Sequence, residues 1–445
     1  MWVEGNRRLY AYYIDTVPQQ PGDSKSMNTL YAAVTHGCAA GLHQQVFNEV
    51  LLRRVWRDRR TNYSTRRLGM VGSDLVGLSN YFQHRQWTQL QERPLSEPAR
   101  ILILTNAGVR LRQLGRLVEA RQCFGAVVRE IESIPAEAQE SEDASYAAAQ
   151  YCELLVIAGK LAGPNGDPDT ALFNGQRAIE FADRGRDSYF KMHARSSLGE
   201  VYFMLGDFER ANELFEQARA IDQEQHPKPP FLYSQSLFRY GYYLIETGRA
   251  QELLDDAGKS EAWGTNGNDT SLLSRAIRSL ILGAAHRALI ESSERRPVII
   301  DEAGKILDQA IVEFRTAGYA DYTVRGLLER AHFYRIRHFA EDYWKALEDL
   351  DLATFEAQRG QMELLYADIL LQRLACYLDF WPVMGNSERV DIRGKVVETL
   401  TEVTDLIKKL HYDRRDEMLA ILQTVAAQQG MSIEPLGPSN SGSHP

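Results

Sequence analysis

The chain has 445 residues, of which 44% are hydrophobic and 25% are charged, a composition that excludes disordered and fibrous proteins. Its formal net charge of -9 argues against a surface built as a whole for nucleic acid. A single hydrophobic core rarely grows beyond about 300 residues, so the length predicts several domains or a repeat array.

The first 27 residues are expected to form an N-terminal segment and a linker. Residues 17–26 carry two prolines and one glycine, which favour turns and loops over helix. The repeat array is therefore predicted to begin at Asn28 and to extend to residue 430.

Two segments, residues 104–128 and 195–227, share one pattern of apolar and small residues that predicts a helical hairpin. In the second segment the pattern consists of Leu198, Gly199, Tyr202, Gly206, Phe208, Ala211, Phe215 and Ala218. In the first segment it consists of Ala107, Gly108, Leu111, Gly115, Leu117, Ala120, Phe124 and Val127. The pattern, which in the second segment ends at Pro227, resembles the tetratricopeptide repeat of about 34 residues.

Small residues should let the paired helices of each hairpin approach closely. Two antiparallel helices come near only where small side chains face each other, so Gly199 and Ala211 are expected at their contact. Tyr202, Phe208 and Phe215 are then expected to fill the wedge between neighbouring hairpins, because no single hairpin can hide its apolar face alone.

Weaker copies of the hairpin follow at spacings of about 35 to 50 residues. They are marked by Ala171 and Ala178 after an enlarged turn at 163–168, by residues 234–258, by Ala303 and Ala310, and by Leu327, Ala331 and Tyr334. Alternating β-branched runs bounded by turn residues are absent from the sequence. The predicted fold class is therefore all-α, a right-handed superhelical solenoid of tetratricopeptide-like helical hairpins.

The C-terminal part of the chain is expected to close the array. Residues 381–388 should interrupt the last hairpin, and a helix near 413–429 should cap the solenoid. Residues 431–445, rich in Pro, Gly and Ser, are predicted to be a disordered tail.

The N-terminal hairpins carry a closer resemblance, in residues 30–57, 63–82 and 106–120. These stretches resemble the C-terminal tetratricopeptide region of bacterial STAND-class signal-transduction NTPases, and residues 5–14 resemble the end of that family's winged-helix segment. The family's region implies a sensor that relays the binding of a partner to an effector. No GxxxxGK[ST] motif is present, so ATP hydrolysis is not expected. The chain is expected to be a split or truncated member, or a free-standing sensor whose motor is another polypeptide.

The sequence predicts no catalytic, metal or cofactor site. Five residues separate His332 from His338, so the two imidazoles do not share a helical face as zinc ligands would. The four cysteines, Cys38, Cys123, Cys152 and Cys376, lie far apart without a CxxC pair, which favours reduced thiols. With no stretch near the roughly 20 apolar residues of a membrane helix, we expect a cytoplasmic, non-enzymatic protein without membrane contact.

A basic patch lies between Arg53 and Arg67. Its arginines are Arg53, Arg54, Arg57, Arg59, Arg60, Arg66 and Arg67, with Trp56 and Tyr63 interleaved and one acidic residue, Asp58. Such a patch can be solvated, can dock an acidic domain, or can contact the phosphates of a nucleic acid or nucleotide. These alternatives remain open at the level of sequence.

The first helices of the hairpins are expected to line a concave groove that binds a partner. The groove residues are predicted to be Thr105, Val109, Arg112, Ser196, Glu200, Phe203, Phe238, Tyr242, Glu246, Arg325, Leu328, His332 and Arg335. Aromatic anchors and arginines that pair with carboxylates suit an extended peptide or a protein surface.

Two functions follow from these features. The chain is predicted to be a non-catalytic sensor and interaction module of a STAND-type system, with a protein or peptide as partner, which can be an NTPase or effector polypeptide. The alternative is a nucleic-acid-linked regulator that uses the basic patch.

Overall fold

The computed structural model describes residues 1–59, 61–91, 94–133, 149–152, 168–225, 234–255, 271–292, 297–339, 341–410 and 412–431. Within these ranges the chain forms helices and no strand, and Phe82 and Leu90 make one isolated antiparallel bridge. The predicted all-α solenoid of tetratricopeptide-like hairpins is therefore confirmed. Arg60, Pro227, residues 163–167 of the enlarged turn and residues 432–445 of the predicted tail lie outside the described residues.

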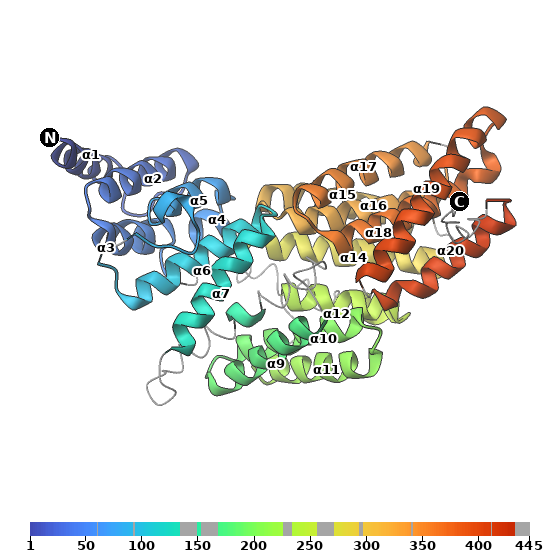
Figure 1. Cartoon of the computed structure of the whole chain (residues 1–445), viewed down its shortest axis with the longest axis horizontal. Helices are drawn as coiled ribbons and strands as arrows, with labels where there is room; N and C mark the ends of the chain where they lie inside the picture. The colour runs from blue at the N-terminus through green and yellow to red at the C-terminus, as the bar shows by residue number, and fades with distance from the viewer. Residues whose placement is uncertain are drawn as a thin grey trace, which may run out of the picture.

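The N-terminal part contains short and irregular helices followed by one regular hairpin (Figure 1). These elements are α1 (Trp2–Asp15), α2 (Ser24–Ala39), α3 (His43–Val46), η1 (Phe47–Val55), α4 (Tyr63–Arg66), α5 (Val71–Ser79), η2 (Gln83–Arg85), α6 (Glu97–Gln113) and α7 (Leu117–Glu132).

The remaining part consists mostly of long helices. They are α9 (Pro168–Arg184), α10 (Ser188–Met204), α11 (Phe208–Gln225), α12 (Gln235–Glu246), α14 (Leu272–Ser292), α15 (Pro297–Ala317), α16 (Ala320–Arg337), α17 (Asp342–Arg359), α18 (Glu363–Phe380), η3 (Trp381–Val383), α19 (Asn386–Leu410), η4 (Asp413–Arg415) and α20 (Asp416–Gln428).

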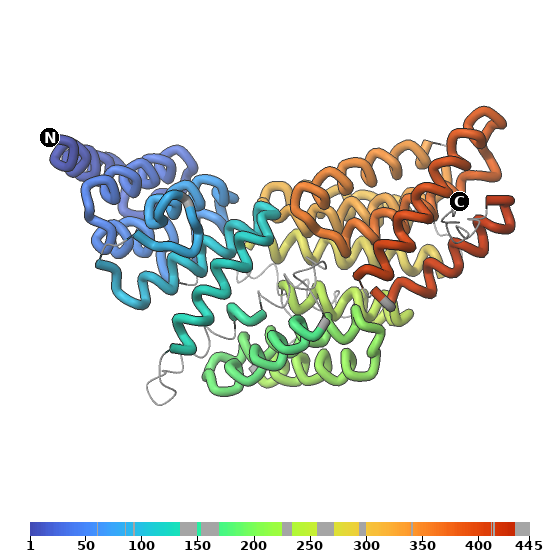
Figure 2. The backbone as a smooth tube through the Cα atoms, in the orientation of Figure 1, coloured from blue at the N-terminus to red at the C-terminus, as the bar shows by residue number. Residues whose placement is uncertain are grey.

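The long helices pack in two layers. Successive helices form the hairpins α10–α11, α14–α15, α16–α17 and α18–α19, while α10, α12, α14, α16 and α18 pack in turn against one another as an inner layer. At the end of the stack α20 packs on α18, and η4 returns to contact α10. Figure 2 shows the resulting elongated, curved molecule, with the N-terminal helices at one end and the C-terminal helices at the other.

An aromatic ring packs against the helical glycine of the repeat pattern in each of the two clearest repeats. A Cβ atom added at Gly199 would lie 3.2 Å from the Phe215 ring, and one added at Gly108 would lie 2.6 Å from the Phe124 ring. Gly199 therefore faces the Phe215 ring at the contact between α10 and α11, where Ala211 is also buried. Phe208 is 44% exposed, so it does not fill the wedge between hairpins as predicted.

The turns of the two repeats require glycine. Gly115 and Gly206, which follow α6 and α10, have φ angles of 76° and 79°. L-residues with a side chain rarely adopt this left-handed conformation. The positive φ angle therefore explains why glycine occupies the turn position of the repeat pattern in both hairpins.

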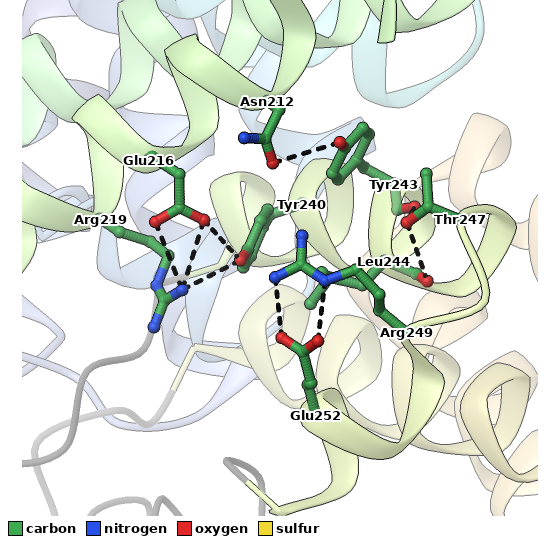
Figure 3. Close-up of polar contacts among 9 residues, drawn as sticks. All are labelled: Asn212, Glu216, Arg219, Tyr240, Tyr243, Leu244, Thr247, Arg249 and Glu252. Carbon is green, nitrogen blue, oxygen red and sulfur yellow. Dashed lines mark hydrogen bonds and ion pairs between the residues drawn. The ribbon is translucent and has the colours of Figure 1, made fainter. Parts of the chain in front are cut away.

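Polar side-chain contacts join α11 to α12 (Figure 3). Tyr240 donates to Glu216 over 3.1 Å, and Arg219 donates to the Tyr240 hydroxyl over 3.1 Å. Tyr243 donates to Asn212 over 3.2 Å. Burial and Glu216 raise the pKa of Tyr240 to about 12, with Arg219 opposing them, so the phenol remains a donor at neutral pH. These bonds orient α12 and leave its opposite face, with Phe238 and Tyr242, for the interior.

The first 27 residues belong to the helical assembly. Helix α1 packs on α2, which begins at Ser24, ahead of the predicted boundary at Asn28. Tyr10 is 3% exposed and donates to Glu49 over 3.0 Å. Its ring packs against Gly37, where a Cβ atom would lie 2.8 Å from the ring. Residues 1–27 therefore act as a packed helix followed by a connection.

A buried carboxylate joins the first helices to the regular repeats. Asp74 on α5 has 0% exposure and accepts from Tyr31 over 2.8 Å, from the Trp56 indole over 2.9 Å and from Arg110 over 2.8 Å. These donors come from α2, from the residue that follows η1, and from α6. Since a buried charge must be paired and hydrogen-bonded, Asp74 fixes the relative placement of four elements.

Candidate functional site

A cavity of about 590 Å³ lies inside the curve of the inner layer. The walls come from α10, α12, α14, α16 and α18, and Tyr412, Arg414, Arg415 and Met418 of the C-terminal segment close it. Cavities of about 300 to 1,000 Å³ are typical of sites that enclose small ligands. We call this cavity the chamber.

The structure brings most of the predicted groove residues together around the chamber. They are Glu200, Phe203, Phe238, Tyr242, Glu246, Arg325, Leu328, His332 and Arg335. Their spacing along the helices places each on the inner face, because residues three or four apart lie above one another on a helix. That these residues bind a partner stays a prediction.

The other four predicted groove residues do not line the chamber. Ser196 is buried in the contact between α10 and α12, where it donates to the His193 carbonyl over 3.0 Å and lies 2.8 Å from the Ser236 hydroxyl. Thr105, Val109 and Arg112 lie on α6, which packs against α5 and α7. The turn after α6 meets the turn after α17, where Gly115 lies close to Gly360, so α6 does not continue the inner layer.

Charged residues make up much of the chamber lining, and the groove prediction missed seven of them, namely Arg239, Arg287, Glu291, Glu329, Asp368, Arg414 and Arg415. The lining contains six arginines and five carboxylates, a formal charge of 6 − 5 = +1. They are Arg239, Arg287, Arg325, Arg335, Arg414 and Arg415, with Glu200, Glu246, Glu291, Glu329 and Asp368. Helix α14 supplies Arg287 and Glu291, and it carries no strong repeat pattern that would have identified them.

Buried ion pairs organise the walls. Arg239 donates to Glu200 over 2.8 Å, joining α12 to α10. Arg287 donates to Glu329 over 3.1 Å and to Glu291 over 2.9 Å, joining α14 to α16. A mostly buried ion pair holds its geometry because each charge would be costly if left alone. The inner face of α10 is therefore fixed relative to that of α12, and the inner face of α14 relative to that of α16.

The C-terminal segment closes the chamber through two arginines. Arg415 donates to Asp368 on α18 over 2.6 Å and lies 3.7 Å from Glu246 on α12. Arg414 lies 3.6 Å from Glu246, and its guanidinium carbon lies 4.4 Å from the centroid of the Phe203 ring. Burial alone would raise the pKa of the Asp368 carboxyl, but Arg415 and Arg414 hold it below its usual value. Asp368 is thus ionised at neutral pH and anchors the closing segment.

Arg325 is the cation of the chamber with the fewest partners. It lies 4.0 Å from Glu200, beyond hydrogen-bond distance, and it donates no hydrogen bond within the described part of the chain. Its guanidinium carbon lies 4.9 Å from the centroid of the Phe238 ring. Within the described residues, Arg325 therefore has one long ion-pair contact and one aromatic contact.

His332 is neutral in this environment. Burial lowers its pKa to about 3, and the charges of Arg287 and Arg335 add to the effect. Arg335 lies 2.6 Å from Nε2 of His332, a contact that a neutral imidazole can accept. The 3.4 Å contact between His332 and Glu291 is therefore not an ion pair at pH 7.

The basic patch has two kinds of arginine. Arg54 is 5% exposed and donates to the carbonyls of Ile14, Val17, Pro18 and Gln19, while Arg57 donates to the Pro21 carbonyl and stacks on Tyr63. Arg53, Arg59, Arg66 and Arg67 are exposed. Arg54 and Arg57 therefore hold the connection between α1 and α2, which removes them from the set that could meet phosphates.

The described residues offer no group of three metal-ligating side chains. All four cysteines are buried, and burial raises the pKa of the Cys38 and Cys376 thiols to about 12, so few thiolates form at neutral pH. Among the helices that the structure describes, none is long and apolar enough to cross a bilayer. The arrangement of the chamber is suited to binding through ion pairs, hydrogen bonds and aromatic contacts.

A match to a protein-family model supports the repeat assignment for one hairpin. Residues 192–224, within α10 and α11, match the model of the tetratricopeptide repeat family. No curated protein matches the chain. Among solved structures, the chain is similar to a Rap protein complexed with competence and sporulation factor, with 12% identity, coverage of 91% of this chain and 98% of that chain, and a TM-score of 0.45. It is also similar to yeast Tom70, with 12% identity, coverage of 91% and 82%, and a TM-score of 0.41.

Proposed function

We propose that this chain is a non-catalytic protein-interaction and sensor module that holds a short segment of a protein or peptide partner in the chamber. The observation that carries the proposal is the enclosure of one cavity by the five helices of the inner layer, with Phe238, Tyr242 and Arg325 among the residues that line it. Aromatic and arginine side chains in an enclosed pocket contribute most of the binding energy in many protein interfaces.

A library of random ten-residue peptides tests this function. The full chain, immobilised, should enrich a related set of peptides over several rounds of selection. An Ala288→Trp variant should lose them, because Ala288 lines the chamber and an indole there would fill it. The matched control is Val312→Trp, on the outer face of α15, where the native side chain is 58% exposed. Selection that fails on the native chain, or that succeeds equally with Ala288→Trp, would refute chamber binding.

The signalling context is a separate part of the proposal. The resemblance of residues 30–57 and 63–82 to the repeat region of STAND-class NTPases supports a sensor whose occupancy is relayed to an NTPase or effector polypeptide. The gene neighbourhood provides the test. A P-loop NTPase or effector gene beside this gene is the expected finding, and neighbours of unrelated function would count against the assignment.

A further inference from the structure

We propose that the segment bound in the chamber is acidic, and that one of its carboxylates is held by Arg325 with Arg414 beside it. This inference rests on the proposed function, because it names the chemistry of the partner that the chamber accepts. Arg325 and Arg414 both line the chamber, but their surroundings differ from those of the other four arginines.

The carboxylates of the chamber already have cationic partners. Glu200 pairs with Arg239 over 2.8 Å and lies 4.0 Å from Arg325, and Asp368 pairs with Arg415. Glu291 and Glu329 both pair with Arg287. Glu246 lies between Arg414 and Arg415, at 3.6 Å and 3.7 Å. A cationic group on a ligand would therefore compete with existing pairs for each carboxylate.

Donor capacity, in contrast, is in excess. Arg325 donates no hydrogen bond to a described residue, and the Nε atoms of Arg335 and Arg414 are buried without an acceptor among the described residues. The Arg414 side chain is 9% exposed and the Arg325 side chain is 21% exposed. Guanidinium donors left without acceptors in a buried place are costly, so an anionic acceptor inside the chamber is favoured. The formal charge of the lining, +1, has the same sign.

The chamber also requires an apolar part in its occupant. Phe238 and Tyr242 lie with ring centroids 4.8 Å apart, and Leu328 and Met418 complete an apolar wall. A bare inorganic anion would satisfy the arginines and leave this wall uncovered. A peptide segment that carries a carboxylate next to an apolar side chain satisfies both, which is why we assign an acidic peptide.

The test compares the native chain with Arg325→Gln in the peptide selection described above. Peptides captured by the native chain should be enriched in Asp and Glu over the starting library, and the best of them should bind Arg325→Gln about tenfold more weakly or worse, as the loss of a charge-assisted pair predicts. The control is Arg315→Gln on α15, which removes the same charge from an exposed position and should leave the affinity unchanged.

The melting temperature without peptide distinguishes an arginine that binds a ligand from one that only stabilises the fold. Without peptide, Arg325→Gln should melt at the native temperature or above it, because the guanidinium gives up no hydrogen bond to the described chain. A lower melting temperature would show that the chain itself uses Arg325 and would overturn the assignment. Inorganic sulfate, offered at the same ionic strength, should not displace the peptide. If sulfate alone displaces it, the chamber is a site for simple anions.

The outcomes separate this inference from the function on which it rests. Captured peptides without enrichment in acidic residues, or equal affinity for native and Arg325→Gln chains, would refute the acidic ligand and leave chamber binding intact. Failure to capture any peptide would refute both.

Discussion

Arg414, in the C-terminal segment, lies 3.6 Å from Glu246 on α12 and stacks over Phe203 on α10, so it joins the end of the stack to the first two helices of the inner layer. Because Arg415 makes a second link to Glu246 and a third to Asp368, the curved stack encloses a chamber.

Substitution of Asp368 should weaken this closure. Asp368→Asn removes one partner of a mostly buried ion pair, so we expect a loss of about 3 kcal/mol in the free energy of unfolding. The control is Glu363→Gln on the same helix, which breaks an exposed pair with Lys409 and should cost less than about 1 kcal/mol. Urea denaturation followed by circular dichroism measures both. Equal losses in the two variants would contradict a structural role for the closing segment.

Protonation of His332 should destabilise the fold as the pH falls. The pKa of His332 is about 3 in the folded chain and about 6.5 in an unfolded chain, so below pH 6.5 the unfolded state binds a proton that the folded state does not. Between pH 7 and pH 5 this difference costs about 2 kcal/mol. No contribution is expected above pH 7, where both states are neutral.

The variant His332→Gln isolates this effect. Its free energy of unfolding should fall less steeply between pH 7 and pH 5 than that of the native chain, by about 2 kcal/mol in total. His193, whose pKa is also lowered by burial and by Arg239, remains in both chains and cancels in the comparison. Parallel pH profiles would show that His332 is protonated in the folded state.

The glycines of the repeat pattern should differ in their tolerance of alanine. Gly108→Ala would place a Cβ atom 2.6 Å from the Phe124 ring, so we expect destabilisation of about 1 to 3 kcal/mol. Gly199→Ala, with 3.2 Å to the Phe215 ring, should cost less. Gly394→Ala on α19 meets nothing within 4 Å and should stabilise the chain by about 0.5 to 1 kcal/mol. Thermal unfolding orders the three variants, and a different order would contradict the packing described for the repeats.

The two kinds of arginine in the basic patch should respond differently to removal of charge. Arg54→Met leaves four backbone carbonyls without their donor and should cost about 2 to 4 kcal/mol in the free energy of unfolding. Arg53→Met, at an exposed position, should change it by less than about 0.5 kcal/mol. Equal effects in urea denaturation would mean that Arg54 does not hold the connection after α1.

The alternative function of the patch has its own measurement. Binding of nucleic acid through several phosphates falls steeply as salt rises. We expect no retardation of single-stranded or duplex DNA in gels at low salt. Retardation that disappears in an Arg53→Met, Arg66→Met double variant would show instead that the basic patch binds nucleic acid.

The hairpins and much of the chamber could be predicted from the sequence because both depend on local spacing. Leu198, Gly199 and Phe215 mark a hairpin whatever its neighbours are, and Phe238, Tyr242 and Glu246 share one face of any regular helix. The placement of α6 could not be predicted, since the contact of Gly115 with Gly360 joins residues with no shared pattern. The role of Arg414 and Arg415 could not be predicted for the same reason, because their partners on α12 and α18 are set by the curvature of the whole stack.

Photo-cross-linking tests the chamber most directly. Benzoylphenylalanine at Met418, which lines the chamber, should cross-link to a peptide selected by the native chain. The same residue at Phe355 on the outer face of α17, where the native side chain is 62% exposed, should not. Cross-links from position 355 and none from position 418 would contradict the account, because they would place the partner outside the curve of the stack.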